Sequence, residues 1–173
     1  MHLNNCLPRR PDGDTHTPSV LTDTQRAFPM KYIPEQRFQV VRETTFKTEN
    51  KRISSSDDAK KLFQQWFDEK GFDKEVFVVA TLNTKNVVTA IQVVTMGTLD
   101  ASLVHPREVF RLAIHNNASS VLVAHNHPSG DPTPSREDIT VTNRIREAGK
   151  IVGIDLLDHI VVGSHSYSIE SGG

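Results

Sequence analysis

The sequence predicts an α/β fold, or an α+β fold with a mixed β-sheet. Three observations predict it: apolar side chains recur at helical spacing over residues 59–67, two β-branched runs at 76–82 and 87–94 are separated by a short polar segment, and residues 121–124 form a continuous apolar run. A short run of this kind is typical of a strand buried on both faces of a sheet. A chain of 173 residues is long enough to bury a sizeable core.

The helices are predicted from their caps as well as from their apolar faces. Serine followed by acidic residues supplies an N-cap and a favourable first turn, proline is accepted at a first helical position, and glycine often follows a helix end. The sequence predicts helices from Ser54–Ser56 to Gly71, from Pro106 to Asn116–Asn117, and from Ser135 to Gly149.

The strands are predicted from short runs rich in β-branched residues. Residues 83–86 are typical of a hairpin turn between the first two strands, and residues 154–157 and 160–162 are expected to close the sheet. Residues 38–41 form another short apolar run, which predicts an edge strand.

Composition excludes several classes of protein. The chain carries 20 Lys and Arg against 21 Asp and Glu, so it lacks the global positive field of a general nucleic-acid binder. Its one cysteine, Cys6, excludes an internal disulfide framework and a multi-cysteine zinc site, so nitrogen and oxygen must hold any metal. No apolar run approaches the roughly 18 residues of a membrane span, and residues 1–20 lack the pattern of a secretory signal. We therefore expect a cytoplasmic protein with no membrane contact.

Proline divides the chain into two parts. Five of the nine prolines fall within residues 1–34, among polar residues that cannot form an apolar face. We predict that residues 1–34 are a disordered or partner-dependent tail, and that residues 35–173 form the domain.

Four polar residues with a defined spacing follow the predicted buried strand. One residue separates His125 from His127, Ser135 follows eight residues later, and Asp138 comes three residues after Ser135. Composition alone predicts this full spacing about 0.002 times in a chain of this length. A Ser-x-x-Asp pair by itself is most often a helix N-cap, and an isolated histidine is most often structural. The joint pattern, placed at the exit of a buried strand, instead favours a site.

The spacing also makes chemical sense for a metal site. Side chains two apart on an extended chain point the same way, so His125 and His127 can offer two imidazoles to one ion, and the helix that follows returns Asp138 towards them. Two neutral imidazoles and a carboxylate suit Zn²⁺, and three protein ligands leave a fourth tetrahedral position open for catalysis. Asp131 is a rival ligand, but Gly130-Asp131-Pro132 is typical of a turn whose aspartate bonds its own backbone.

The pattern of His125, His127, Ser135 and Asp138 resembles the JAMM motif of the JAB/MPN metalloprotease superfamily. A wider set of segments is similar to the RadC branch of that superfamily, and the resemblance covers roughly residues 53 to 170. These segments are residues 97–100, 105–108, 125–131 and 157–159. The resemblance implies the JAB/MPN, cytidine deaminase-like architecture, a curved mixed β-sheet flanked by helices, with zinc held by the two histidines and Asp138.

The resemblance also implies roles for two further residues. The superfamily uses a glutamate at the start of the strand after the first helix, which falls on Glu75, as the general base towards a zinc-activated water. Ser135 is expected to donate a hydrogen bond to the oxyanion that forms on the attacked carbonyl. From the residues alone, Glu75 is equally compatible with a solvent-facing position. Glu108 is the alternative base, although its helical position suits an ion pair, and His159 is expected behind the ligands or in the core.

Two functions compete at this point. The first is a zinc-dependent hydrolase that cleaves peptide or isopeptide bonds in a protein or peptide partner. The second is a RadC-like DNA-repair or mobile-element factor that acts on or near nucleic acid, with or without catalysis. A two-metal nuclease needs more bridging carboxylates than this cluster offers, and the net charge gives no general DNA footprint, so we favour the hydrolase. Longer RadC-like chains carry an N-terminal helix-hairpin-helix module that residues 1–50 are too short and too proline-rich to hold, as in the short forms of mobile elements and prophages.

Overall fold

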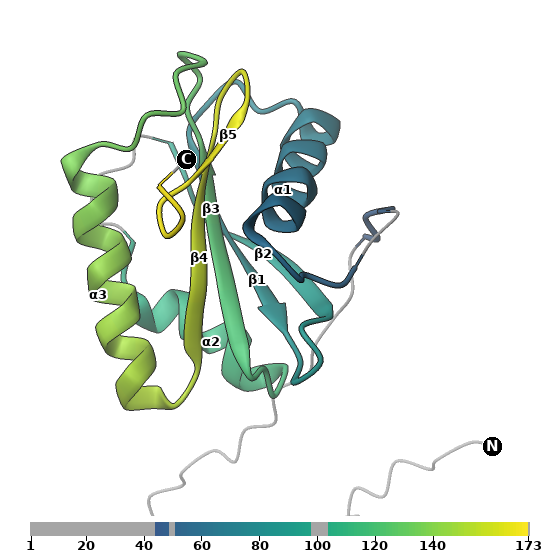
Figure 1. Cartoon of the computed structure of the whole chain (residues 1–173), viewed down its shortest axis with the longest axis vertical. Coiled ribbons are helices and arrows are strands. Elements are labelled where there is room, and N and C mark those ends of the chain that lie inside the picture. Colours follow the sequence, from purple (N-terminus) through teal and green to yellow (C-terminus); the bar gives the residue numbers. More distant parts are fainter. Residues whose placement is uncertain (1–43, 49–50, 98–103, 173) are drawn as a thin grey trace, which may run out of the picture. The chain divides into compact units, whose positions relative to one another are not determined.

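The computed structural model describes residues 44–48, 51–97 and 104–172, and it has the predicted mixed sheet flanked by helices (Figure 1). The elements in chain order are α1 (Ser56–Lys70), β1 (Val76–Leu82), β2 (Val88–Met96), α2 (Pro106–His115), β3 (Ser120–Asn126), α3 (Arg136–Val152), β4 (Asp155–Val162) and β5 (Ser166–Ser168). The strand run predicted at 38–41 and the tail predicted at 1–34 lie outside the described residues, so both stay predictions.

The five strands form one open sheet in the order β2-β1-β3-β4-β5. β1 pairs antiparallel with both β2 and β3, and β5 pairs antiparallel with β4. β3 and β4 are parallel, because α3 carries the chain back across the sheet between them. The sheet is therefore mixed, and β3, its central strand, is buried along its whole length.

Helices cover both faces of the sheet: α1 packs on one face, and α2 and α3 pack on the other (Figure 1). Alternation along the strands divides the core accordingly, since successive side chains point to opposite faces. The even-numbered residues of β1 pack in the α1 layer, whereas Phe77 and Val79 pack in the layer of α2 and α3. The same alternation on β3 directs Val121 and Val123 towards α3.

The predicted helix starts are confirmed. Ser55 caps α1 in a reciprocal capping box with Asp58, Pro106 is the first residue of α2, and Ser135 caps α3 in a second capping box with Asp138. Gly71 follows α1 in the left-handed conformation that favours glycine.

The predicted end of the third helix is wrong. α3 continues through Gly149 to Val152, and Gly153 is the left-handed residue that ends it. Gly149 lies inside the helix because space is short there: a Cβ atom at this position would come within 3.2 Å of the Phe110 ring and would also press on the carbonyl oxygen of Ile154. Gly149 is therefore a close-packing position inside the helix, and Gly153 marks the helix end.

The end of the sheet also differs in detail from the prediction. The runs at 154–157 and 160–162 belong to one continuous strand, β4, and the short strand β5 has no apolar run to predict it. Within the part of the chain that the structure describes, no helix is both long and apolar enough to cross a membrane.

Candidate metal centre

The antiparallel pairing of β1 and β3 brings the candidate residues to one edge of the sheet. Phe77 near the start of β1 pairs with His125 near the end of β3, because the two strands are antiparallel. Glu75, which precedes β1, and His127, which follows β3, therefore lie at the same edge. The N-terminus of α3 reaches this edge as well and carries Asp138 in its first turn.

Three side chains converge there at distances that suit a metal ion. The Nε2 atoms of His125 and His127 are 3.0 Å apart, and Asp138 places Oδ1 3.2 Å from His125 Nε2 and Oδ2 3.7 Å from His127 Nε2. Two donors on a tetrahedral zinc ion, with bonds of about 2.0–2.1 Å, are about 3.3 Å apart. His125 and Asp138 are buried, and the side chain of His127 is 17% exposed, so the cluster opens to solvent at His127.

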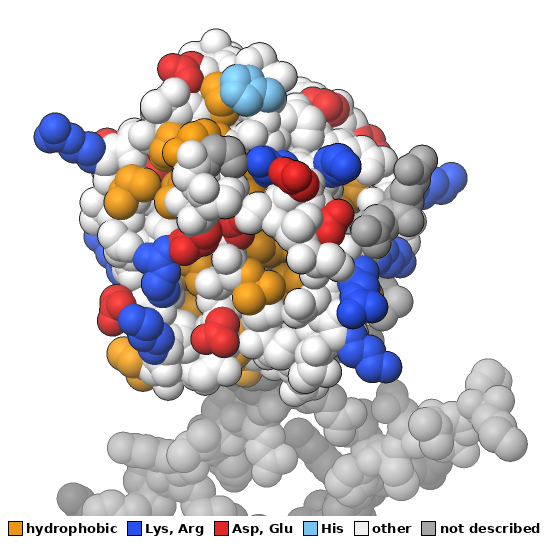
Figure 2. All heavy atoms as spheres, in the orientation of Figure 1, with side chains coloured by type: hydrophobic (Ala, Val, Ile, Leu, Met, Phe, Trp, Pro, Cys, Tyr) orange, Lys and Arg blue, Asp and Glu red, His pale blue; other side chains and the backbone are white. Residues whose placement is uncertain are grey.

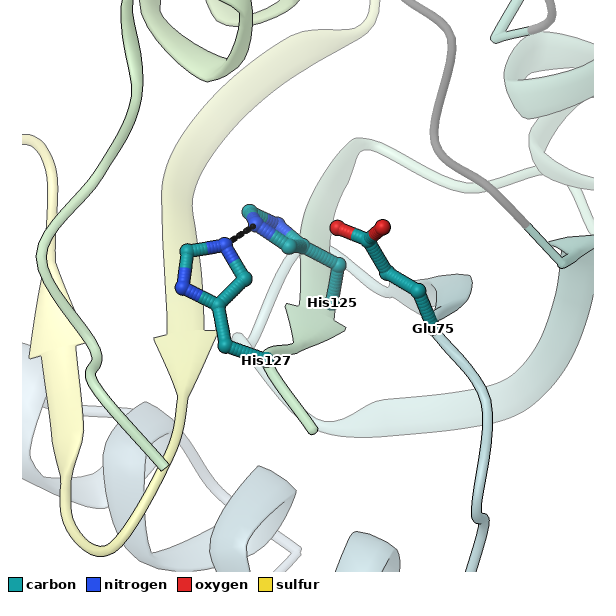
Figure 3. A group of neighbouring side chains, drawn as sticks. All are labelled: Glu75, His125 and His127. Carbon is teal, nitrogen blue, oxygen red and sulfur yellow. Dashed lines mark hydrogen bonds between the residues drawn. The ribbon is translucent and has the colours of Figure 1, made fainter. Parts of the chain in front are cut away.

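Glu75 adds a second carboxylate beside the imidazoles. Ligand atoms of Glu75, His125 and His127 all lie within 4.8 Å of one another. In Figure 3 the Glu75 carboxylate points towards the His125 ring from the segment that leads into β1. Asp138 and Glu75 are thus the two candidates for a third ligand beside the histidines, and the sequence spacing favours Asp138.

A family model described as "RadC-like JAB domain" matches residues 53–173. This chain belongs to the RadC-like JAB domain family. A UPF0758 protein of Clostridium botulinum strain Hall is 50% identical over 124 residues, which cover 71% of this chain and 54% of the relative. A UPF0758 protein of Desulforamulus reducens is 53% identical over 107 residues, covering 61% of this chain and 47% of the relative. The chain thus spans about half the length of the curated relatives it matches.

Asn126 holds the segment that carries Glu75 in this RadC-like JAB domain. Its side-chain oxygen accepts a hydrogen bond from the backbone N–H of Val76 (2.7 Å), and its side-chain nitrogen donates to the carbonyl of Lys74 (3.0 Å). The amide side chain therefore bonds the peptide groups on both sides of Glu75. From the other side, Gly97 N–H donates to the Glu75 carbonyl (2.9 Å). The residue between the two histidines thus positions the backbone of the candidate base.

Asp138 is held as an anion. Burial acts to raise the pKa of its carboxyl group, but the hydrogen bond and charge of His125, together with hydrogen bonds from Ser135, outweigh burial and hold that pKa well below its usual range. A positive charge beside the imidazoles keeps the Asp138 carboxylate ionised, and a metal cation held by the two histidines supplies that charge without a hydrogen on Nε2 of His125.

The backbone N–H and the hydroxyl of Ser135 are both hydrogen-bonded to Asp138. Its backbone N–H and its hydroxyl both donate to Oδ2 of Asp138, each at 2.7 Å, and its hydroxyl oxygen accepts from the Asp138 backbone N–H at 3.1 Å. A hydroxyl has one hydrogen to give, so donation to a substrate oxygen requires this hydroxyl to rotate away from Asp138.

The two alternative residues have other partners. Asp131 forms the expected turn, in which its carboxylate accepts from the Thr133 N–H at 2.9 Å, and its backbone carbonyl is the group that contacts His127. Glu108 pairs with Arg107 and Arg111 on α2. Sequence reasoning missed the contacts of Asn126. It placed His159 behind the ligands or in the core, and the structure agrees, because His159 is buried and its Nε2 lies 2.8 Å from Nδ1 of His125. The motif itself marks Asn126, but only the fold shows what it bonds.

Proposed function

We propose that this domain is a zinc-dependent hydrolase that cleaves peptide or isopeptide bonds. The observation that carries the proposal is the convergence of His125, His127 and Asp138 within 3.0–3.7 Å of one another, with the Glu75 carboxylate beside them. Membership of the RadC-like JAB domain family is consistent with this site, because the JAMM-type spacing of the site residues is the feature on which the family resemblance rests.

The donor set supports zinc as the metal. Two imidazole nitrogens and one carboxylate oxygen form a borderline-soft set, and the described part of the cluster offers no thiolate. When bound, a zinc ion with an open position supplies a Lewis acid that polarises a carbonyl group and lowers the pKa of water. The cluster reaches solvent at His127, which is the side from which water and substrate would approach it.

We assign Glu75 the role of general base. Its carboxylate lies close enough to the imidazoles to reach a water molecule that enters the site, and it would take a proton from that water as the oxygen attacks the substrate carbonyl. The same carboxyl group would then give the proton to the amine as the carbon–nitrogen bond breaks. Asn126 and the Gly97 N–H would hold the backbone of this residue still during the two transfers.

We assign Ser135 a role in orienting Asp138 and, after rotation of its hydroxyl, in donating to the oxyanion. The present contact with Asp138 supports the first role directly. The second rests on the resemblance and on the position of Ser135 at the N-terminus of α3, where the helix dipole also favours negative charge.

The substrate partner is proposed to be a protein or peptide. On the face shown in Figure 2, acidic and basic side chains both occur among uncharged ones, which fits a mixed surface better than a track for a phosphate backbone.

The proposed function can be tested without knowing the natural substrate. The full chain, supplied with zinc, would be screened against a peptide library and a set of lysine-linked isopeptides, with Glu75→Gln as the matched inactive control. Cleavage by the wild type that is absent from the control supports the proposal. Equal cleavage by both proteins points to a contaminant or to another base, and would contradict the role of Glu75.

A further inference from the structure

A buried chain of hydrogen bonds leads from His125 away from the metal centre. Nδ1 of His125 lies 2.8 Å from Nε2 of His159, and Nδ1 of His159 lies 2.6 Å from the hydroxyl oxygen of Thr142. The Thr142 hydroxyl in turn donates to the backbone carbonyl of Asp138 at 2.6 Å. The chain begins at one candidate ligand and ends on the backbone of another.

The direction of every bond in this chain follows from its last acceptor. A carbonyl oxygen only accepts, so the single hydroxyl hydrogen of Thr142 is used on Asp138. The contact between Thr142 and His159 therefore requires an N–H at Nδ1 of His159. A neutral imidazole has one N–H, so Nε2 of His159 accepts, and Nδ1 of His125 must be the donor.

Both rings are shielded from solvent. The residues His125 and His159 are both 0% exposed, and Phe77 stacks on the first ring and meets the second edge-on, with centroids 6.2 and 5.4 Å away. This enclosure favours a neutral His159 ring, because burial penalises a charged imidazole.

We propose that His159 and Thr142 are positioning residues that fix His125 in its Nδ1–H form, so that its Nε2 lone pair faces the metal. His127 is fixed in the same form by a different acceptor, because its Nδ1 lies 2.6 Å from the carbonyl oxygen of Asp131. Two bare Nε2 atoms then face each other at 3.0 Å beside a carboxylate, an arrangement that a cation stabilises. The role towards zinc rests on the proposed function, whereas the placement of the hydrogens does not.

A pair of substitutions at Thr142 tests the role towards zinc. Thr142→Val keeps the shape but removes the hydroxyl, which frees His159 to reverse and to present an N–H to His125. Thr142→Ser keeps the hydroxyl and is the matched control. In a competition titration of Zn²⁺ against a coloured chelator, Thr142→Val should bind zinc about 10- to 100-fold more weakly than the wild type, and Thr142→Ser should stay close to it. Equal affinity of the wild type and Thr142→Val would overturn the proposal.

Nitrogen NMR of the histidine rings tests the hydrogen positions directly and needs no metal. In the zinc-free wild type, at a pH where the rings are neutral, His125 and His159 should both carry their hydrogen on Nδ1. Thr142→Val should shift His159 to the Nε2–H form, a change that a purely structural role for Thr142 would not produce. A hydrogen on Nε2 of His159 in the wild type would overturn the proposal. Absence of zinc binding by the wild type would instead sink the proposed function and leave this NMR result to decide the inference.

Discussion

Asp138 and Asp158 are buried to nearly the same degree, but the pKa values of their carboxyl groups are shifted in opposite directions. The residues Asp138 and Asp158 are 4% and 3% exposed. Burial is the largest influence on both carboxyl groups and acts to raise the pKa, but only for Asp158 does it prevail. The hydroxyls of Ser168 and Ser56, the N–H of His159 and the charge of Lys60 lower the pKa of Asp158 too little to reverse the effect.

The difference lies in the kind of partner that each carboxylate has. Asp138 faces two imidazoles at the edge of the sheet, where a cation can bind, whereas Asp158 accepts hydrogen bonds from Ser168, from His159 N–H and from Glu170 N–H, which tie β4 to the C-terminal segment. Burial alone therefore does not identify a metal site. A buried carboxylate whose neighbours outweigh the effect of burial on its pKa is suited to a cation, and one whose neighbours do not is suited to a structural role.

The largest expected effect is a difference in zinc affinity between variants of Asp138 and Asp158. Asp138→Asn removes a ligand charge and should weaken zinc binding by about 100-fold or more, because two imidazoles alone hold an open site poorly. Asp158→Asn is the matched control and should bind zinc within about threefold of the wild type, since it lies outside the ligand set. Titration of each purified variant with zinc measures both values. Similar losses of zinc affinity in the two variants would show that Asp138 and Asp158 do not differ in their role towards zinc.

The second effect concerns the rate of substrate cleavage rather than the binding of zinc. Glu75→Gln keeps the size of the side chain but removes the proton acceptor, so cleavage of a substrate found in the library screen should fall by about 100-fold or more while zinc is retained. Asn126→Ala removes the hydrogen bonds on both sides of Glu75 and should also lower the rate with zinc retained. Glu108→Gln is the control. Loss of activity in Glu108→Gln with full activity in Glu75→Gln would move the base to Glu108.

A smaller effect is expected at Ser135. Ser135→Ala removes the capping hydroxyl and one hydrogen bond to Asp138, so the free energy of unfolding should fall by about 1 kcal/mol. Ser55→Ala, which removes the equivalent cap of α1 far from the metal centre, is a control for the loss of a cap. Turnover should fall in Ser135→Ala beyond any fall in Ser55→Ala. Equal turnover in the two variants would remove Ser135 from the chemistry.

The smallest effect is a dependence of stability on pH that comes from Asp158. Because its folded pKa is raised, its carboxyl group adds to stability below the unfolded pKa, and this contribution is lost as the pH rises through the folded pKa. Asp158→Asn does not titrate, so the wild type should lose stability relative to this variant as the pH rises above the unfolded pKa of about 4. Urea unfolding at several pH values measures the difference. A difference that moves the other way would show that folding lowers the pKa of Asp158 instead of raising it.

The sequence was sufficient for the parts of the site that lie close together along the chain. The capping box of Ser135 and Asp138 and the strand that leads into His125 were predictable because caps and apolar runs are local signals. The sequence also predicted every helix and four of the five strands in the described residues, and it misjudged Gly149 because close packing leaves no local signal.

The contacts that position the site were beyond reach of the sequence because they join distant segments. Asn126 bonds residues about 50 positions earlier, His159 reaches His125 across the parallel pair of β3 and β4, and Thr142 meets His159 only once α3 is packed on the sheet. Each partner is set by strand register and helix placement, which periodicity does not specify.

The most direct test of the proposed zinc site is the zinc content of the purified full chain, grown with zinc and kept free of chelators, by elemental analysis. We expect about one zinc ion per chain in the wild type and in Glu75→Gln, and far less in His125→Ala and His127→Ala, because each of these loses one of three ligands. Absence of stoichiometric zinc from a folded wild-type protein, or full retention of zinc by both histidine variants, would contradict the proposed site.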